Sequence, residues 1–149
     1  MNLEELTKLY LRDMDNLAKE MSSYKNADII WKTTGEVNNS AGNLCMHLCG
    51  NLQHFIGAIL GESGYIRNRD NEFNCVDVPL EDILSEIENT KTIISSTLSD
   101  LDPKRLSETY PLKVFGYEMS CGYFLMHLLG HLNYHLGQIS YHRRILDMR

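Results

Sequence analysis

The sequence predicts an all-α protein, a four-helix bundle with long inter-helix loops. Apolar residues recur at steps of three and four in four separate segments, which is the period of an amphipathic helix. Long polar stretches separate these segments, and none of them alternates convincingly as a strand does. Four amphipathic helices without a sheet are most economically packed as a bundle. With 149 residues, the chain is expected to form one domain, residues 1–149.

The first two helices are expected over about residues 3–24 and 41–60. Asn2 is a good N-cap for the first, because Glu5 follows three residues later in a capping-box arrangement. Gly61 is expected to end the second, and the polar stretch 25–40 to connect the two. The apolar stripes are Leu3, Leu6, Tyr10, Met14, Leu17, Met21 and Tyr24, and then Leu44, Leu48, Leu52, Phe55 and Ile59.

The third and fourth helices follow two further loops. Residues 62–78 show no helical period and are expected to be a long loop. Pro79 is a favourable first-turn residue, so a helix is expected from there to about Leu101, before Asp102-Pro103. A third loop covers 104–117, and the last helix covers about 120–147. Within it, Gly130 and Gly137 are expected to permit close approach of a neighbouring helix, since glycine otherwise weakens a helix.

Composition excludes several classes of function. Hydrophobic residues make up 43% and charged residues 23%, an ordinary balance for a globular protein. The net charge of −6 argues against binding of a nucleic-acid backbone, and no apolar run is long enough to cross a membrane. The N-terminus does not resemble a signal peptide, and the four cysteines form no Cys-x-x-Cys pair. We therefore expect a cytoplasmic protein with reduced thiols.

The histidines are the residues most suggestive of a site. His127, His131 and His135 are four apart on the last helix, and imidazoles at i and i+4 can share one metal ion. The outer two are about 12 Å apart, so the pair is either 127 with 131 or 131 with 135. The second helix offers His47 or His54, of which one can join the site. A polar rim beside the core would explain such histidines equally well.

Two segments carry a resemblance to a known family. HLNYHLGQI, residues 131–139, looks like the last-helix signature of the DinB-like family of metal-dependent proteins, His-x-x-x-His followed by Gly-Gln. NLCMHLCGNLQHFI, residues 43–56, resembles that family's second helix, in which one histidine is a ligand. RNRDNEF, residues 67–73, resembles the following loop in one branch of the family. The matches occur in the family's order and span most of the chain.

The resemblance implies a ligand set and a set of functions. It selects His47, His131 and His135 as metal ligands, and it leaves His54, His127 and His142 out of the ligand set. It also implies the four-helix fold, frequent dimerisation and a divalent ion, with nickel or zinc expected first. Some members of the family are thiol-dependent transferases or isomerases. A small-molecule substrate and a homodimer are therefore expected.

The surroundings of the expected metal site are sparse in acids. Neither histidine-bearing helix has a carboxylate near its histidines, which is a gap for a hydrolase, although Asp70 and Glu72 of the loop could fold over the site. Asn51 and Gln138 are the candidates for hydrogen bonding to the ligands, and ordinary surface amides are the alternative. Arg67 and its acidic neighbours favour a salt-bridged loop anchor over a substrate clamp.

Two functions from different classes follow. The first is a metal-dependent enzyme acting on a small molecule, by hydrolysis or by thiol transfer. Three neutral imidazoles leave an open coordination position, as a catalytic site requires. The alternative is a non-catalytic metal-binding or self-associating structural or stress protein. An open position facing a pocket favours the enzyme, and a closed, dry surround favours the alternative.

Overall fold

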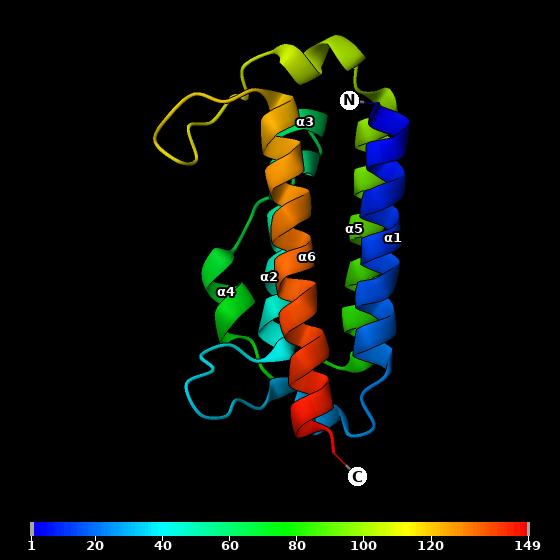
Figure 1. Cartoon of the computed structure of the whole chain (residues 1–149), viewed down its shortest axis with the longest axis vertical. Helices are drawn as coiled ribbons and strands as arrows, with labels where there is room; N and C mark the ends of the chain where they lie inside the picture. The colour runs from blue at the N-terminus through cyan, green and yellow to red at the C-terminus, as the bar shows by residue number, and fades with distance from the viewer. Residues whose placement is uncertain (1, 149) are drawn as a thin grey trace.

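The computed structural model describes residues 2–148 and shows an all-helical fold. Four long helical stretches lie alongside one another (Figure 1). They are α1 (Leu3–Ser22), the stretch from α2 (Ala41–Leu52) to α3 (Ile59–Gly61), α5 (Leu80–Asp100) and α6 (Cys121–Leu146). No strand occurs among the described residues, although Thr109 and Ser120 form one isolated β-bridge. The prediction of an all-α protein is confirmed, and the DinB-like bundle arrangement stays a prediction.

The helices pack through the apolar stripes that the sequence defines. α1 lies against both α5 and α6, while α2 contacts α6 and α5. The largest fully buried side chains include Tyr10 and Met14 from α1 and Leu48 from α2. The Tyr10 hydroxyl donates a hydrogen bond of 2.6 Å to the Leu125 carbonyl, so a buried phenol ties α1 to α6. This core fixes the relative positions of α2 and α6, which carry the histidines.

The second helical stretch is not regular along its whole length. A π-helical segment, η2 (Gln53–Ala58), separates α2 from α3. Within it, the Phe55 carbonyl accepts a hydrogen bond of 2.7 Å from the Tyr110 hydroxyl. The helix was expected to stop at Gly61, but the left-handed residue that ends it is Glu62, with φ of 50°. An added Cβ on Gly61 would overlap Thr97 instead, so this glycine serves packing rather than termination.

The expected loops contain short helices. Residues 25–40 include a 3-10 turn, η1 (Ala27–Trp31), and Pro103 to Ser107 form another, η3. The prediction that 62–78 is a loop without helix is wrong in one part, because α4 (Arg69–Asn74) lies there. The Asn68 side chain caps α4 by accepting from the Asn71 amide at 3.1 Å. Six residues are too few to display a helical period, so α4 left no pattern to detect.

Candidate metal centre

α2 carries His47 in a nearly fully buried helix. Only Met46 among its twelve residues is not buried, because this helix is surrounded by α4, α5 and α6. The side chain of Ser40 caps the helix by accepting from the Asn43 amide at 3.1 Å. His47 itself is 6% exposed, so its ring must find polar partners inside the protein.

Three imidazoles meet between α2 and α6. The Nε2 atom of His131 lies 3.2 Å from Nε2 of His47 and 3.1 Å from Nε2 of His135. A ligand atom from each of the three lies within 4.8 Å of the others. A tetrahedral ion with bonds of about 2.0–2.1 Å would separate its ligand nitrogens by about 3.3 Å. The two Nε2–Nε2 distances of 3.2 and 3.1 Å are therefore close to the distance expected between ligand nitrogens of one divalent ion.

The outer ring nitrogens determine which way two of these imidazoles point. His47 Nδ1 lies 3.0 Å from Glu72 Oε1, and His135 Nδ1 lies 2.6 Å from Gln138 Oε1. Both partners are acceptors, so in the neutral form of each ring Nδ1 carries the proton and Nε2 presents a lone pair to the cluster. A neutral His131 can donate to one of them at most. In at least one pair, two Nε2 lone pairs then face each other with no proton between them. A bound cation would remove this repulsion.

Burial keeps the central imidazole neutral. Desolvation, together with the smaller effect of charge on the neighbouring His135 and His47, lowers the pKa of His131 to about 3. Desolvation is also the main cause that lowers the pKa of His135, against the opposing effect of its hydrogen bond to Gln138. Neutral imidazole is the form that binds metal, so these two residues are in the ligating form near pH 7.

Glu72 of α4 reaches the far side of the His47 ring. Its Oε1 also accepts 2.8 Å from Arg67 Nη2, and its Oε2 accepts 2.8 Å from Arg67 Nε, a bidentate pair. Burial alone would raise the pKa of Glu72, but the hydrogen bonds from His47 and Arg67 and the guanidinium charge outweigh it and lower the pKa. The carboxylate is thus charged and fully engaged in holding its two partners. Arg67 acts as the expected salt-bridged anchor.

Other contacts hold α4 against α2. The Asn43 side chain donates to the Cys75 carbonyl at 2.7 Å and to the Glu72 carbonyl at 3.2 Å. The Phe73 ring lies 4.7 Å from the His47 ring, centroid to centroid. Gly50 is the point of closest approach, because an added Cβ there would overlap the Glu72 carboxylate. These contacts fix the carboxylate relative to His47.

Within residues 2–148, Gly130 and Gly137 do not have their predicted role of permitting the close approach of a neighbouring helix. A Cβ built on either glycine meets nothing within 4 Å among the described residues, so neither is needed for a close approach inside this chain. The glycines that approach neighbours closely lie on the second helical stretch, with Gly42 against Trp31 and Gly50 against Glu72. The physical cause is that α2 is buried on every side, whereas α6 has one face in solvent.

The remaining histidines lie outside the cluster. His142 Nδ1 is 2.7 Å from the Tyr24 hydroxyl and Nε2 is 2.8 Å from the Lys32 carbonyl, so both of its nitrogens have partners. His127 lies on the exposed side of α6 against Phe115, and His54 packs beside Phe55. Cys45 and Cys49 are buried, and all four cysteines are free thiols.

The two amides expected near the ligands, Asn51 and Gln138, differ in their hydrogen bonds. Gln138 contacts His135, as the spacing of three residues indicates. The buried Asn51 Oδ1 has no hydrogen-bond partner among residues 2–148, and the same is true of His131 Nδ1. Asn51 Oδ1 on α2 is an acceptor, and His131 Nδ1 on α6 is a potential donor.

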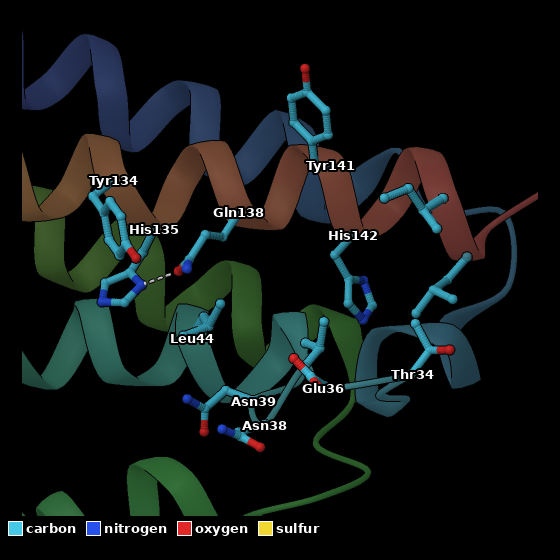
Figure 2. A pocket seen from close by; sticks show the side chains of 13 residues that line it. Thr34, Glu36, Asn38, Asn39, Leu44, Tyr134, His135, Gln138, Tyr141 and His142 are labelled. Carbon is cyan, nitrogen blue, oxygen red and sulfur yellow. Dashed lines mark hydrogen bonds between the residues drawn. The ribbon is translucent and has the colours of Figure 1, made fainter.

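A pocket begins at His135 and runs along α6. It has a volume of about 580 Å³ and lies between α6 and the segment 34–39 (Figure 2). His135 and Gln138 lie near one end of it, with Leu44 opposite them, and His142 lies further along. The volume falls within the range of small-molecule sites, about 300–1,000 Å³. The carboxylate of Glu36 is the one acidic group among its lining residues, which include no lysine or arginine.

Sequence reasoning missed the interactions that position His47. Asn43, His47 and Gly50 are at i, i+4 and i+7 on α2, a polar and small stripe on a helix with no charged residue. That stripe was the available signal that another segment packs there. The acceptor that packs against this stripe is Glu72, for which the sequence predicts only an acid that could fold over the site.

The fold and the centre define an all-helical protein with a partly buried three-histidine cluster that could hold a metal ion. The chain belongs to the family described as "Protein of unknown function (DUF1572)", whose model matches residues 3–148. A comparison with curated proteins gave no match. The family description does not mention the DinB-like proteins, so that resemblance stays a prediction. No helix in residues 2–148 combines the length and apolarity needed to cross a bilayer.

Proposed function

We propose that His47, His131 and His135 bind one divalent metal ion, nickel or zinc, through their Nε2 atoms. The observation that carries this proposal is the convergence of these three nitrogens while acceptors outside the cluster hold the Nδ1 protons of two of the rings. A cluster serving only as a polar rim would be expected to distribute donors and acceptors so that each lone pair meets a proton.

The surrounding residues have defined roles in this proposal. Glu72 orients His47 and raises the basicity of its Nε2, and Gln138 does the same for His135 with a neutral acceptor. Asn51 is proposed to accept from His131 Nδ1, directly or through a water molecule, since each has an unpaired buried atom of the opposite kind. Arg67 holds Glu72 in place.

We further propose that the chain is a DinB-like four-helix-bundle enzyme, one domain, acting on a small molecule by hydrolysis or thiol transfer. A divalent ion on three imidazoles supplies Lewis acidity for a carbonyl or activates a thiol or water as nucleophile. The pocket beginning at His135 supports an enzyme because it gives a small molecule access to one edge of the centre. Glu72 is engaged with His47 and Arg67, so it is not free to act as a base at the Nε2 side.

Metal analysis tests the binding. The full chain, purified without a His-tag or added metal, is expected to take up about one equivalent of nickel or zinc on titration. His131→Ala is expected to abolish uptake because the central nitrogen is lost. His142→Ala is the matched control on the same helix, and it should leave uptake unchanged. Equal effects of the two substitutions, or no uptake by the unaltered chain, would contradict the proposal.

A second experiment separates an enzyme from a structural metal protein. The cobalt-substituted chain, titrated with 2-mercaptoethanol, is expected to show a new thiolate-to-metal absorption band, because an open coordination position accepts the thiol. An unchanged spectrum would favour the alternative of a non-catalytic metal-binding or stress protein. With either function, the protein is expected to be cytoplasmic, and to be a homodimer by analogy with the DinB-like family.

A further inference from the structure

Exposed apolar side chains are concentrated in the C-terminal third of the chain. Of the fourteen exposed large hydrophobic residues in the described part of the chain, ten lie between residues 112 and 148. Four of them belong to the segment before α6, and the other six are on α6 or directly after it. Scattered exposed hydrophobic residues need no explanation, but an accumulation on one element marks an interaction surface.

The exposed residues of α6 form one stripe. Its members follow one another at steps of three and four and therefore lie within roughly 100° of the helix circumference. Between Cys121 and His142 the helix has no aspartate, glutamate, lysine or arginine, whereas a solvated helix face normally carries charges. We define the α6 stripe as Tyr123, Met126, Gly130, Tyr134, Gly137, Tyr141, Ile145 and Met148.

The α6 stripe is left largely uncovered by the rest of residues 2–148. Tyr134 and Tyr141 are 64% and 68% exposed, and Met126 and Ile145 are 53% and 54% exposed. The surface around Gly130 is equally open, with no described atom within 4 Å of an added Cβ. A glycine inside a helix costs about 1 kcal/mol relative to alanine. Both the exposed rings and the glycines are therefore unfavourable in an isolated chain.

We propose that the α6 stripe binds the same stripe of a second copy, with the two α6 helices antiparallel. A two-fold interface requires a surface complementary to itself. One antiparallel register pairs Tyr134 with the partner's Gly137 and Tyr141 with the partner's Gly130. The same register places Met126 opposite the partner's Ile145. Each ring thus packs over a glycine, which lets the helices approach closely.

Area and charge favour a second copy over other occupants. The exposed parts of the six large stripe residues amount to roughly 700 Å², if a large side chain contributes about 150–250 Å² in full. Each partner buries about 800 Å² in a standard interface, and Phe115 and Tyr117 lie close enough to add to the stripe. An anionic membrane would require several free lysines and arginines beside the stripe. Of the two arginines in the last turn of α6, however, Arg143 is paired with Glu20, and the chain carries a net charge of −6.

The interface would adjoin the metal centre without depending on it. Tyr134 lies beside His135, with ring centroids 5.2 Å apart, and Tyr134, Tyr141 and Ile145 all line the pocket beside His135. A second copy on the stripe would therefore border that pocket. None of the three ligands belongs to the stripe, so association and metal binding can be tested separately.

Sedimentation equilibrium of the full chain, metal-free and metal-loaded, tests this inference. A dimer is expected at micromolar concentration in both states, and a monomer would overturn the proposal. Met126→Lys and Ile145→Glu are each expected to weaken the dimer at least tenfold, because each buries a charge without a partner. Val76→Lys is the control, because Val76 is 63% exposed but lies outside the stripe.

The double variant tests the register. Combining Met126→Lys with Ile145→Glu is expected to restore most of the lost affinity, since each lysine then faces a glutamate of the partner at two symmetric places. Circular dichroism establishes that each variant keeps its helical content. A dimer unaffected by the single substitutions, or a double variant no stronger than the weaker single variant, would overturn the proposed antiparallel pairing.

Discussion

Glu72→Gln is the substitution that most directly tests how the metal centre is built. The carboxylate accepts from His47 Nδ1 at 3.0 Å and from two nitrogens of Arg67 at 2.8 Å. Glutamine keeps the size of the side chain and can still offer one carbonyl oxygen to His47. It removes the negative charge that makes the imidazole a stronger donor of electron density to a metal ion.

The size of the effect follows from the type of hydrogen bond. A bond to a charged group contributes about 1.5–3 kcal/mol, and a neutral bond contributes about 0.5–1.5 kcal/mol. The difference of about 1–1.5 kcal/mol corresponds to roughly tenfold weaker binding of the metal. Glu72→Ala removes the acceptor altogether and is expected to approach the hundredfold loss at the upper end for such partners.

Calorimetric titration of the metal-free chain with Zn²⁺ at pH 7 measures this loss. Glu20→Gln is the matched control, because Glu20 also pairs with an arginine, Arg143, at 2.7 Å but lies on α1 and makes no contact with the three imidazoles. The reasoning is refuted if Glu72→Gln binds zinc within about twofold of the unaltered chain while His131→Ala does not bind, since a hydrogen bond of this kind should be worth more.

Two further predictions concern the packing and the protonation of the centre. Gly50→Ala is expected to displace the Glu72 carboxylate and weaken zinc binding about tenfold, whereas Gly130→Ala, in open space, should leave zinc affinity unchanged; equal affinities for the two variants would contradict the role of Gly50. The metal-free chain is expected to lose stability as the pH falls from about 6.5 towards 3, because the pKa of His131 is about 3 when folded and about 6.5 when unfolded, so the unfolded chain binds the additional proton. Urea midpoints measured across that range should fall less steeply for His131→Asn, and parallel curves for the two chains would show that His131 is not the group responsible.

The sequence by itself determined the helices and the local pair of ligands. Asn2 caps α1 as expected, with its side chain accepting from the Glu4 amide at 2.9 Å. The bounds of α5 and α6 agree to within one or two residues with those predicted from the apolar period and from the residues that begin and end each helix. The approach of His131 to His135 also follows from the helix, because a separation of four residues places two rings on one face. These features are set within a few turns of chain.

Which distant side chains meet was decided only by the tertiary structure. Residue spacing left His47 and His54 as alternatives, and the resemblance to DinB-like proteins selected His47, which packing brings to His131 across 84 residues. Glu72 reaches His47 from a helix too short to show a period, through a gap that only a glycine at position 50 leaves open. Gly130 and Gly137, which looked like contact points, face open space. Periodicity specifies the face of a helix, but the distance between two helices depends on how all their side chains interlock, which no single segment encodes.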